Sequence, residues 1–210
     1  GMQLDLLASE IQVNVSCALA EDIGSGDLTA KLVPAGQQAH ARIITREAAV
    51  LCGSAWLEEV FRQIDPGVAV QWRAHDGDAV TAGQLLCVLD GPARSLLTGE
   101  RTGLNFLQTL SAVATRTQTI VKAVAGTKAA ILDTRKTVPG LRRALKYAVR
   151  CGGGSNHRMG LYDGVLIKEN HVAAAGGIAQ VLERAVEVAC GVPVQIEVES
   201  LAQLEEAIAA

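Results

Sequence analysis

Charged side chains directly follow three short apolar runs in the second half of the sequence. Residues 133–137 read DTRKT, residues 168–171 read KENH and residues 197–199 read EVE. If the runs are parallel strands, their carboxyl ends meet at one rim, which is where ligands of α/β folds bind. Arg and Lys side chains there would bind carboxylates or phosphates. The sequence therefore predicts a site for a small anionic ligand at this rim.

The distribution of charge supports the same prediction. Residues 133–171 contain eight basic and three acidic residues, a local net charge of +5, although the whole chain has a net charge of −3. A positive segment in an acidic chain favours a small, multiply anionic ligand and disfavours a general nucleic-acid binder. Four of these basic residues are expected only to form the solvated face of a helix: Arg142, Arg143, Lys146 and Arg150.

A glycine-rich segment, residues 151–158 (CGGGSNHR), ends in two further cationic groups. Glycines let backbone amides approach an anion, and His157 and Arg158 would then bind it. A flexible connector without a binding role explains the glycines equally well. His40 and His75 have no comparable neighbours in the sequence, so we expect them on the surface.

Glu197 and Glu199 alternate along a predicted strand, so both carboxylates should lie on one face. They would serve as metal or ribose ligands, or would stabilise a developing sugar cation. No HxH, HExxH or CxxC pattern occurs in the sequence, so a dedicated zinc site is not expected. Magnesium that arrives with a phosphorylated substrate suits these oxygen ligands better.

Apolar periodicity predicts the elements that position these groups. In the first part of the chain it predicts helices over 5–20 and 54–64 and strands over 39–50, 68–74 and 84–89. A long helical pattern over 96–125 should form one or two helices that link two domains. Beyond it, strands over 129–132, 165–167 and 194–198 alternate with helices over about 140–150, 177–189 and from Ser200 onward.

This order of elements predicts an α/β protein with two domains. Residues 1–105 should form an α+β sandwich-like domain that includes the start of the linking helix, and residues 106–210 a partial (βα) barrel of parallel strands. Three βα units are fewer than the eight of a closed barrel. The sheet should therefore be small and open, or the front part of a longer barrel.

Length and composition agree with a globular protein: 210 residues that are 49% hydrophobic allow one substantial core or two small ones. The apolar runs fall far short of the roughly 20 residues that span a bilayer, and the first five residues lack a basic segment before an apolar one. We therefore expect no transmembrane helix and a cytoplasmic location. Five scattered cysteines favour buried, reduced thiols over disulfides or metal ligands.

Several motifs together resemble those of the quinolinate phosphoribosyltransferase family, the nicotinate-nucleotide pyrophosphorylases (carboxylating) of NAD biosynthesis. They follow the family's order from residue 19 to residue 199. The motifs are residues 19–29 (LAEDIGSGDLT), 100–105 (ERTGLN), 134–140 (TRKTVPG), 156–158 (NHR), 168–171 (KENH) and 197–199 (EVE).

The resemblance implies a fold and a reaction. The fold would be an N-terminal α/β sandwich followed by an incomplete-type α/β barrel, in a homodimer where Arg101 reaches into the partner's site. The reaction would join quinolinate and 5-phosphoribosyl 1-diphosphate to give nicotinate mononucleotide, pyrophosphate and CO₂, with Mg²⁺. Family members continue through further barrel strands, so the chain is expected to be C-terminally short.

The resemblance also implies roles for single residues. Arg135, His157 and Arg158 would clamp the carboxylates of quinolinate. Lys136 and Glu197 would be catalytic, with Glu197 near the ribose and the metal ion. The implied substrate-binding set is Arg101, Arg135, Lys136, His157, Arg158, Lys168 and Glu197.

Three other interpretations remain open from the sequence. A paralogue associated with molybdenum transport shares the TRKT and HR motifs and would act on another anionic substrate. A fragment that only binds anions is a second alternative. The third is a lipoyl- or biotinyl-carrier hairpin over residues 76–86, which requires a lysine at a tight turn, whereas the nearest lysines are Lys31 and Lys122.

Overall fold

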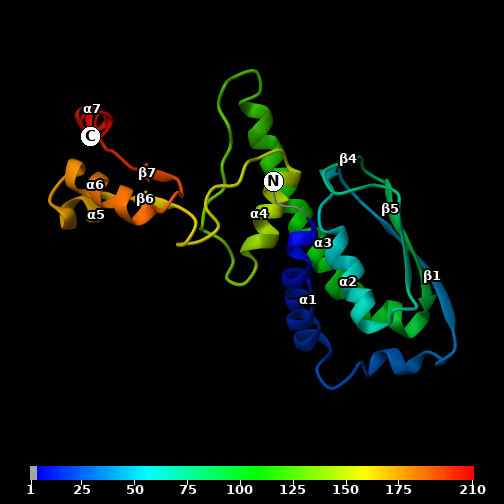
Figure 1. Cartoon of the computed structure of the whole chain (residues 1–210). Coiled ribbons are helices and arrows are strands. Elements are labelled where there is room, and N and C mark those ends of the chain that lie inside the picture. Colours follow the sequence, from blue (N-terminus) through cyan, green and yellow to red (C-terminus); the bar gives the residue numbers. More distant parts are fainter. Residues whose placement is uncertain (1–3) are drawn as a thin grey trace. The chain divides into compact units, whose positions relative to one another are not determined.

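The computed structural model describes residues 4–210, and it divides the chain into two compact units, residues 1–157 and 158–210 (Figure 1). Residues 1–3, on which the expected absence of a leader partly rests, lie outside the described residues. The predicted domain boundary at residue 105 falls inside the long helix α3 (Ala93–Ala123) and stays a prediction. The two units are described separately below.

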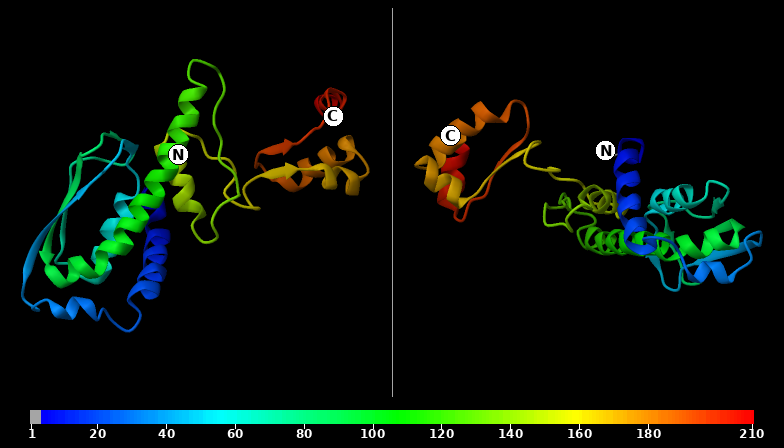
Figure 2. Two further views of the ribbon diagram at one scale, coloured as in Figure 1. Left: turned by 180° about the vertical axis from the view of Figure 1, so that it is seen from behind. Right: turned by 90° about the horizontal axis from the view of Figure 1, so that it is seen from below.

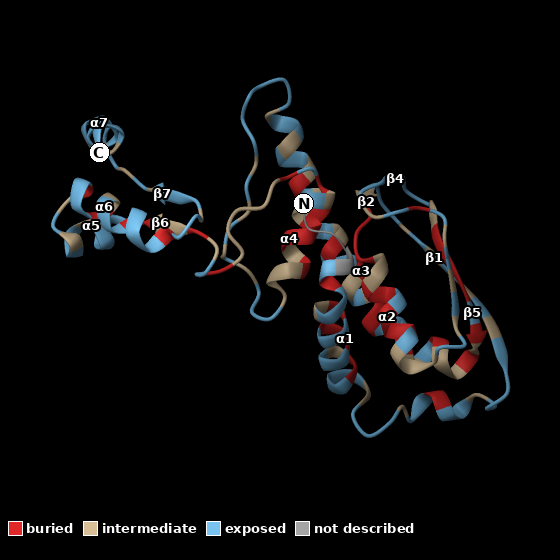
Figure 3. Ribbon diagram, viewed as in Figure 1, coloured by how far each residue is buried: buried red, intermediate tan, exposed pale blue. Residues whose placement is uncertain are grey.

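An antiparallel sheet with the order β1-β5-β3 forms one side of the first unit. Its strands are β1 (Gln38–Ile44), β3 (Ala69–Trp72) and β5 (Leu85–Pro92), and a separate short pair is formed by β2 (Ala49–Val50) and β4 (Ala79–Val80). Burial alternates along β1, as expected for a strand with one face toward the core. Figure 3 shows buried residues along β5 and on the neighbouring helices, and further buried residues elsewhere in the chain.

Helix α2 (Ser54–Ile64) and helix α3 pack together and against the sheet. Leu57 and Phe61 of α2 share a buried cluster with Leu107 of α3 and with residues of β5. The close approach depends on Gly99, because a Cβ there would lie 2.6 Å from the Phe61 ring. The pair of helices therefore forms the cover of the sheet and the centre of the unit.

A second cluster joins four helices of the same unit. It holds α1 (Ala8–Ile23), which follows the short helix η1 (Leu4–Leu7), against α2, α3 and α4 (Arg142–Cys151); a further short helix, η2, spans Thr29–Leu32. The rings of Trp56 and Tyr147 lie 5.5 Å apart at its centre. Asn14, which is buried, accepts a hydrogen bond from Trp56 Nε1 at 3.0 Å and donates one to the Gly140 carbonyl at 3.3 Å. This cluster fixes α4 to the N-terminal helices.

The second unit contains a parallel pair of strands with helices between and after them (Figure 2). Ile167, Val181 and Ala185 form its buried centre. The elements are β6 (Val165–Ile167), α5 (Glu169–Ala175), α6 (Ile178–Ala189), β7 (Val194–Ile196) and α7 (Leu201–Ala209).

The sequence predicts most of these elements, with three differences. The strand expected over 39–50 divides into β1 and β2. The strand expected over 129–132 is reduced to one parallel bridge between Leu132 and Ser155, because only the backbone groups of residues 131–133 find partners there. Helix α5 and strand β4 are not predicted from the sequence, because each is too short to show a periodic pattern of apolar residues. The α/β fold class and the parallel pairing of strands 165–167 and 194–196 are confirmed.

Other expectations are tested by exposure. His40 and His75 are on the surface, as predicted, with 58% and 85% of their side chains exposed. All five cysteines are free thiols. The prediction that they are buried is confirmed for Cys52 and Cys87, and Cys151 is only partly buried. It is wrong for Cys17 and Cys190, which are exposed on α1 and at the end of α6. In the part of the chain that the structure describes, no helix is long and apolar enough to cross a membrane.

Replacing Gly152 with Ala should destabilise the protein by about 1–3 kcal/mol, the usual cost of overpacking. The new Cβ would collide with the Ala114 carbonyl oxygen and lie 2.7 Å from Thr117 Cβ, and both atoms belong to the rigid helix α3. Thermal unfolding should detect this as a fall in Tm of about 2–4 °C for each kcal/mol.

Gly36→Ala is the matched control, because a Cβ there meets no atom within 4 Å. It should change stability by less than about 0.5 kcal/mol. Equal Tm values for the two variants would contradict the packing described for Gly152.

Candidate functional site

Two segments of the first unit are paired where the anionic site is predicted. Ser155 N donates to the Ile131 carbonyl at 2.8 Å, and Asp133 N donates to the Ser155 carbonyl at 3.1 Å. This is the pattern of two parallel strands, reduced to one bridge. The end of the first apolar run therefore lies beside the end of the glycine-rich segment.

The Asp133 carboxylate connects these two segments through three hydrogen bonds. Its Oδ1 accepts from Lys146 Nζ at 2.6 Å and from His157 N at 2.8 Å, and its Oδ2 accepts from Asn156 Nδ2 at 2.6 Å. Only 6% of the Asp133 side chain and 1% of the Lys146 side chain are exposed. Asp133 thus acts as a buried anchor that sets the position of His157.

The prediction that α4 presents four solvated basic residues is wrong for Lys146. The ammonium group is buried because it pairs with Asp133 and also donates to the His157 carbonyl at 3.2 Å. Arg142 is also engaged: its Nε donates to Thr137 Oγ1 at 3.1 Å and its Nη2 to the Arg135 carbonyl at 3.4 Å. Of the four, only Arg150 is classed as exposed.

The structural roles of Asp133, Lys146 and Asn156 are what the sequence analysis missed. An acidic residue at the end of an apolar run, followed by a lysine on the next helix, was the available signal. That signal is weak, because the sequence does not distinguish a buried ion pair between residues 13 positions apart from two separately solvated charges.

Arg135 carries an unsatisfied donor. Its Nε is buried and has no hydrogen-bond partner among the described residues. Buried guanidinium N–H groups normally have partners, so an orphaned one marks a place where a ligand acceptor would be stabilised. Thr137 N and Arg142 both bond to the Arg135 carbonyl, which fixes the backbone that carries this side chain. Lys136, the next residue, is exposed.

The second unit carries the other three predicted residues of the rim. Lys168 and Glu197 directly follow the paired strands β6 and β7, and Glu197 N donates to the Ile167 carbonyl at 2.9 Å. Both side chains are exposed. Arg158 Nη1 donates to the Gly164 carbonyl at 3.4 Å. The structure therefore brings Lys168 and Glu197 to the carboxyl ends of adjacent strands, as the sequence predicts.

Arg101 is exposed on α3 and lines two cavities of the first unit, of about 350 and 540 Å³, that no residue of 131–157 lines. The smaller cavity also contains Asp22 and Asp27. Hydrogen bonds from Ala30 N and Thr98 Oγ1 lower the pKa of Asp27, so this carboxylate stays charged at neutral pH. Neither cavity that Arg101 lines therefore includes a residue of the segments around Asp133.

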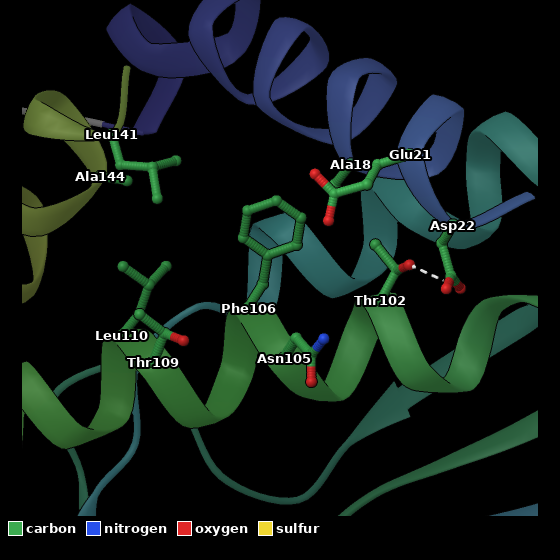
Figure 4. Close-up of a pocket in the computed structure, with 10 residues that line it drawn as sticks. All are labelled: Ala18, Glu21, Asp22, Thr102, Asn105, Phe106, Thr109, Leu110, Leu141 and Ala144. Atoms are coloured by element: carbon green, nitrogen blue, oxygen red, sulfur yellow. Dashed lines mark hydrogen bonds between the residues drawn. The ribbon is translucent and has the colours of Figure 1, made fainter. Parts of the chain in front are cut away.

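A further cavity, of about 200 Å³, lies between α1, α3 and α4 (Figure 4). Its wall is mostly apolar, with Phe106 at its centre, and its charged groups are the carboxylates of Glu21 and Asp22. Asp22 accepts a hydrogen bond from Thr102 at 3.4 Å. Carboxylates would repel a dianion, so this cavity does not match the anionic ligand that the basic segment predicts.

Two family models match the chain. One describes the N-terminal domain of quinolinate phosphoribosyl transferase and matches residues 27–111, and the other describes its C-terminal domain and matches residues 113–210. Together they include every residue that the sequence analysis assigned to the site.

Curated proteins and solved structures are similar to this chain over most of its length. It is 44% identical to a probable nicotinate-nucleotide pyrophosphorylase [carboxylating] from Bacillus subtilis over 90% of this chain and 66% of that protein. For the Mycobacterium leprae protein named nicotinate-nucleotide pyrophosphorylase [carboxylating], identity is 46%, over 91% and 69%.

A solved structure of the Francisella tularensis nicotinate-nucleotide pyrophosphorylase superposes with a TM-score of 0.93 at 46% identity, over 96% of this chain and 71% of that one. NadC from Streptococcus pyogenes gives a TM-score of 0.92 at 39% identity, over 100% and 73%. The chain spans about two thirds of the length of these bacterial curated relatives.

Replacing Lys146 with Met should destabilise the protein by about 3–5 kcal/mol, because the Asp133 carboxylate would stay buried without its cation. Urea unfolding followed by tryptophan fluorescence would measure the loss. The double variant Lys146→Met with Asp133→Leu should recover part of it, because no unpaired charge then remains.

Arg143→Ala provides the control on the same helix. Arg143 pairs with Glu10 at 3.4 Å, but 39% and 40% of the two side chains are exposed, so its loss should cost less than about 1 kcal/mol. If Lys146→Met costs no more than Arg143→Ala, the ion pair is not the anchor described here.

Proposed function

Because this chain belongs to the quinolinate phosphoribosyltransferase family, we propose that it serves the phosphoribosyl transfer that makes nicotinate mononucleotide in de novo NAD biosynthesis. The substrates would be quinolinate and 5-phosphoribosyl 1-diphosphate, and the other products pyrophosphate and CO₂. The observation that carries the proposal is the buried, unpartnered Nε of Arg135 beside a segment anchored by Asp133.

Quinolinate carries two adjacent carboxylates, and Arg135, His157 and Arg158 are the proposed clamp for them. A guanidinium presents parallel N–H donors to a carboxylate, which gives orientation as well as attraction. The hydrogen bond from His157 N to Asp133 fixes the backbone that carries the imidazole. A dianion held this way keeps its ring nitrogen in a defined position for attack on the sugar.

The phosphoribosyl donor adds several more negative charges, so cations must offset the repulsion between the two substrates. Lys136 and Lys168 are exposed and would supply them, Lys136 from the 133–137 segment and Lys168 from the end of β6. In this proposal Lys136 acts as a catalytic residue, because it neutralises charge next to the reacting atoms.

The chemistry proceeds in two stages. The ring nitrogen forms a bond to the ribose carbon, and the bond from that carbon to pyrophosphate breaks, leaving a pyridinium. The bond to the 2-carboxylate then breaks, CO₂ leaves, and the electron pair stays on the ring carbon, which takes a proton. The exposed Glu197 carboxylate would stabilise the positive charge that develops on the ribose.

We propose that the reaction uses Mg²⁺, held in part by Glu197. Glu197 offers carboxylate oxygens at the carboxyl end of β7, and hard oxygen donors are those that Mg²⁺ prefers. When bound with the donor, the ion would neutralise part of the diphosphate charge. We also propose a cytoplasmic homodimer, in which the exposed Arg101 would reach the site of the partner. The exposure of Arg101, and the absence of residues 131–157 from the cavities that it lines, support this.

The alternatives from the sequence are less well supported. The named relatives are nicotinate-nucleotide pyrophosphorylases, which disfavours the molybdenum-associated paralogue. The carrier-hairpin interpretation of residues 76–86 loses its basis, because this segment lies inside the match to the N-terminal domain model.

Arg135→Ala should weaken quinolinate binding by roughly 10- to 150-fold, the loss expected for hydrogen bonds to a charged group. Calorimetric titration with quinolinate would measure it, and circular dichroism should show an unchanged fold. Arg150→Ala removes the same charge from an exposed position and should bind normally. Equal affinities for the two variants would remove Arg135 from the clamp.

Incubation of the chain with quinolinate, 5-phosphoribosyl 1-diphosphate and Mg²⁺ tests the reaction itself. We expect nicotinate mononucleotide by chromatography, and no product when nicotinate replaces quinolinate, because nicotinate lacks the second carboxylate that the proposed clamp binds. Formation of product from nicotinate would contradict the proposed reaction for this chain, and so would the absence of product from both acids.

A further inference from the structure

Three segments of the first unit bring two thiols and a carboxylate together. The Sγ atoms of Cys52 and Cys151 and a carboxylate oxygen of Asp76 all lie within 4.8 Å of one another. Cys52 precedes α2, Asp76 lies in the turn before β4, and Cys151 is the last residue of α4. Among the described residues, no other group of His, Cys, Asp and Glu gathers in this way.

The carboxylate in this cluster is already committed to the protein. Asp76 Oδ1 accepts from Ser54 N at 3.1 Å, and Oδ2 accepts from Gly53 N at 3.2 Å and from Tyr147 Oη at 2.7 Å. These bonds satisfy the free N–H groups at the start of α2. The two sulfur atoms are therefore the pair left for chemistry, and a metal ion would compete with three existing bonds.

Both cysteines are held in place by their backbones. Cys52 N donates to Ser111 Oγ of α3 at 2.9 Å, and Ser111 Oγ donates to the Cys52 carbonyl at 3.0 Å. Gly152, which follows Cys151, is packed against the Ala114 carbonyl. The sulfur atoms consequently stay close together through contacts that do not involve the thiols themselves.

The two thiols differ in their surroundings. Cys52 is fully buried, and its hydrogen bond to Cys151 together with burial raises its pKa. Cys151 is only partly buried, and the hydrogen bond from the Cys52 thiol lowers the pKa of Cys151. Because Cys151 is the less buried of the two residues, a peroxide in solvent would reach it before Cys52. Cys87, in contrast, is buried alone, and burial raises its pKa to about 12.

We propose that Cys52 and Cys151 form a reversible disulfide when the protein meets a peroxide, with Cys151 reacting first and Cys52 resolving the product. This modification site is independent of the proposed enzymatic activity. It would link the segment before α2 to the start of the glycine-rich segment, residues 151–158.

The steps balance with a peroxide as oxidant. The Cys151 thiolate attacks one peroxide oxygen, the O–O bond breaks, and the other oxygen leaves as an alkoxide or hydroxide, so that the sulfur is oxidised to a sulfenic acid. Cys52 sulfur then bonds to Cys151 sulfur, the S–O bond breaks, and hydroxide leaves with the Cys52 proton as water. A dithiol reductant then breaks the Cys52–Cys151 disulfide by thiol–disulfide exchange and restores both thiols.

The test is peptide mapping of the whole chain. Reduced protein is treated with an equimolar amount of hydrogen peroxide, alkylated in denaturant and digested without reduction. We expect a linked peptide pair containing Cys52 and Cys151, a mass loss of about 2 Da before alkylation, and reversal by dithiothreitol. If both cysteines are recovered alkylated while Cys17 and Cys190 are oxidised, the proposal is overturned.

Variants separate the pair from the exposed thiols. Cys17→Ser with Cys190→Ser removes both exposed thiols and should still form the linked pair. Cys52→Ala leaves Cys151 without a resolving partner, so with two equivalents of peroxide, one for each oxygen added, Cys151 should gain about 32 Da as a sulfinic acid. An unoxidised Cys151 in a folded Cys52→Ala protein would contradict its role as the reacting thiol, and the wild-type map decides the linkage if that variant does not fold.

Discussion

The buried ion pair between Asp133 and Lys146 holds together the two segments on which the proposed anion site depends. A buried carboxylate is costly unless cations and N–H groups surround it, and Asp133 meets that demand with Lys146, Asn156 and the backbone of His157. Satisfying Asp133 therefore fixes the glycine-rich segment against the end of the first apolar run. Two residues after Asp133, the Arg135 Nε is buried without a hydrogen-bond partner in the described chain, so it could donate to an acceptor on a ligand.

Helix α4 links this pair to the rest of the first unit. Ala144, Tyr147 and Ala148 pack into the helical cluster around Trp56, while Lys146 on the same helix reaches Asp133. Tyr147 also donates to Asp76, and Cys151 ends the helix beside Cys52. One ten-residue helix thus contributes to the core, the Asp133–Lys146 ion pair and the thiol pair. A shift of α4 would therefore change the geometry of all three.

The sequence predicts the local elements well and the long-range pairing poorly. Ser54 and the Asp65-Pro66-Gly67 stop give the bounds of α2 directly, and the run at 165–167 forms the expected parallel strand. The motif residues at the carboxyl ends of β6 and β7 lie where the pattern places them. Burial of Lys146 could not be predicted, because helix periodicity says nothing about a carboxylate 13 residues earlier that needs its charge. The roles of Arg135, His157 and Glu197 toward substrate stay predictions.

The central claim is that the segments anchored by Asp133 bind a small dicarboxylate. Titration of the ¹⁵N-labelled chain with quinolinate, followed by backbone amide chemical shifts, tests this most directly. The account predicts saturable shifts at residues 134–137 and 155–158, with little change around Phe106. Shifts confined to the cavity between α1, α3 and α4, or no saturable shifts at all, would contradict it.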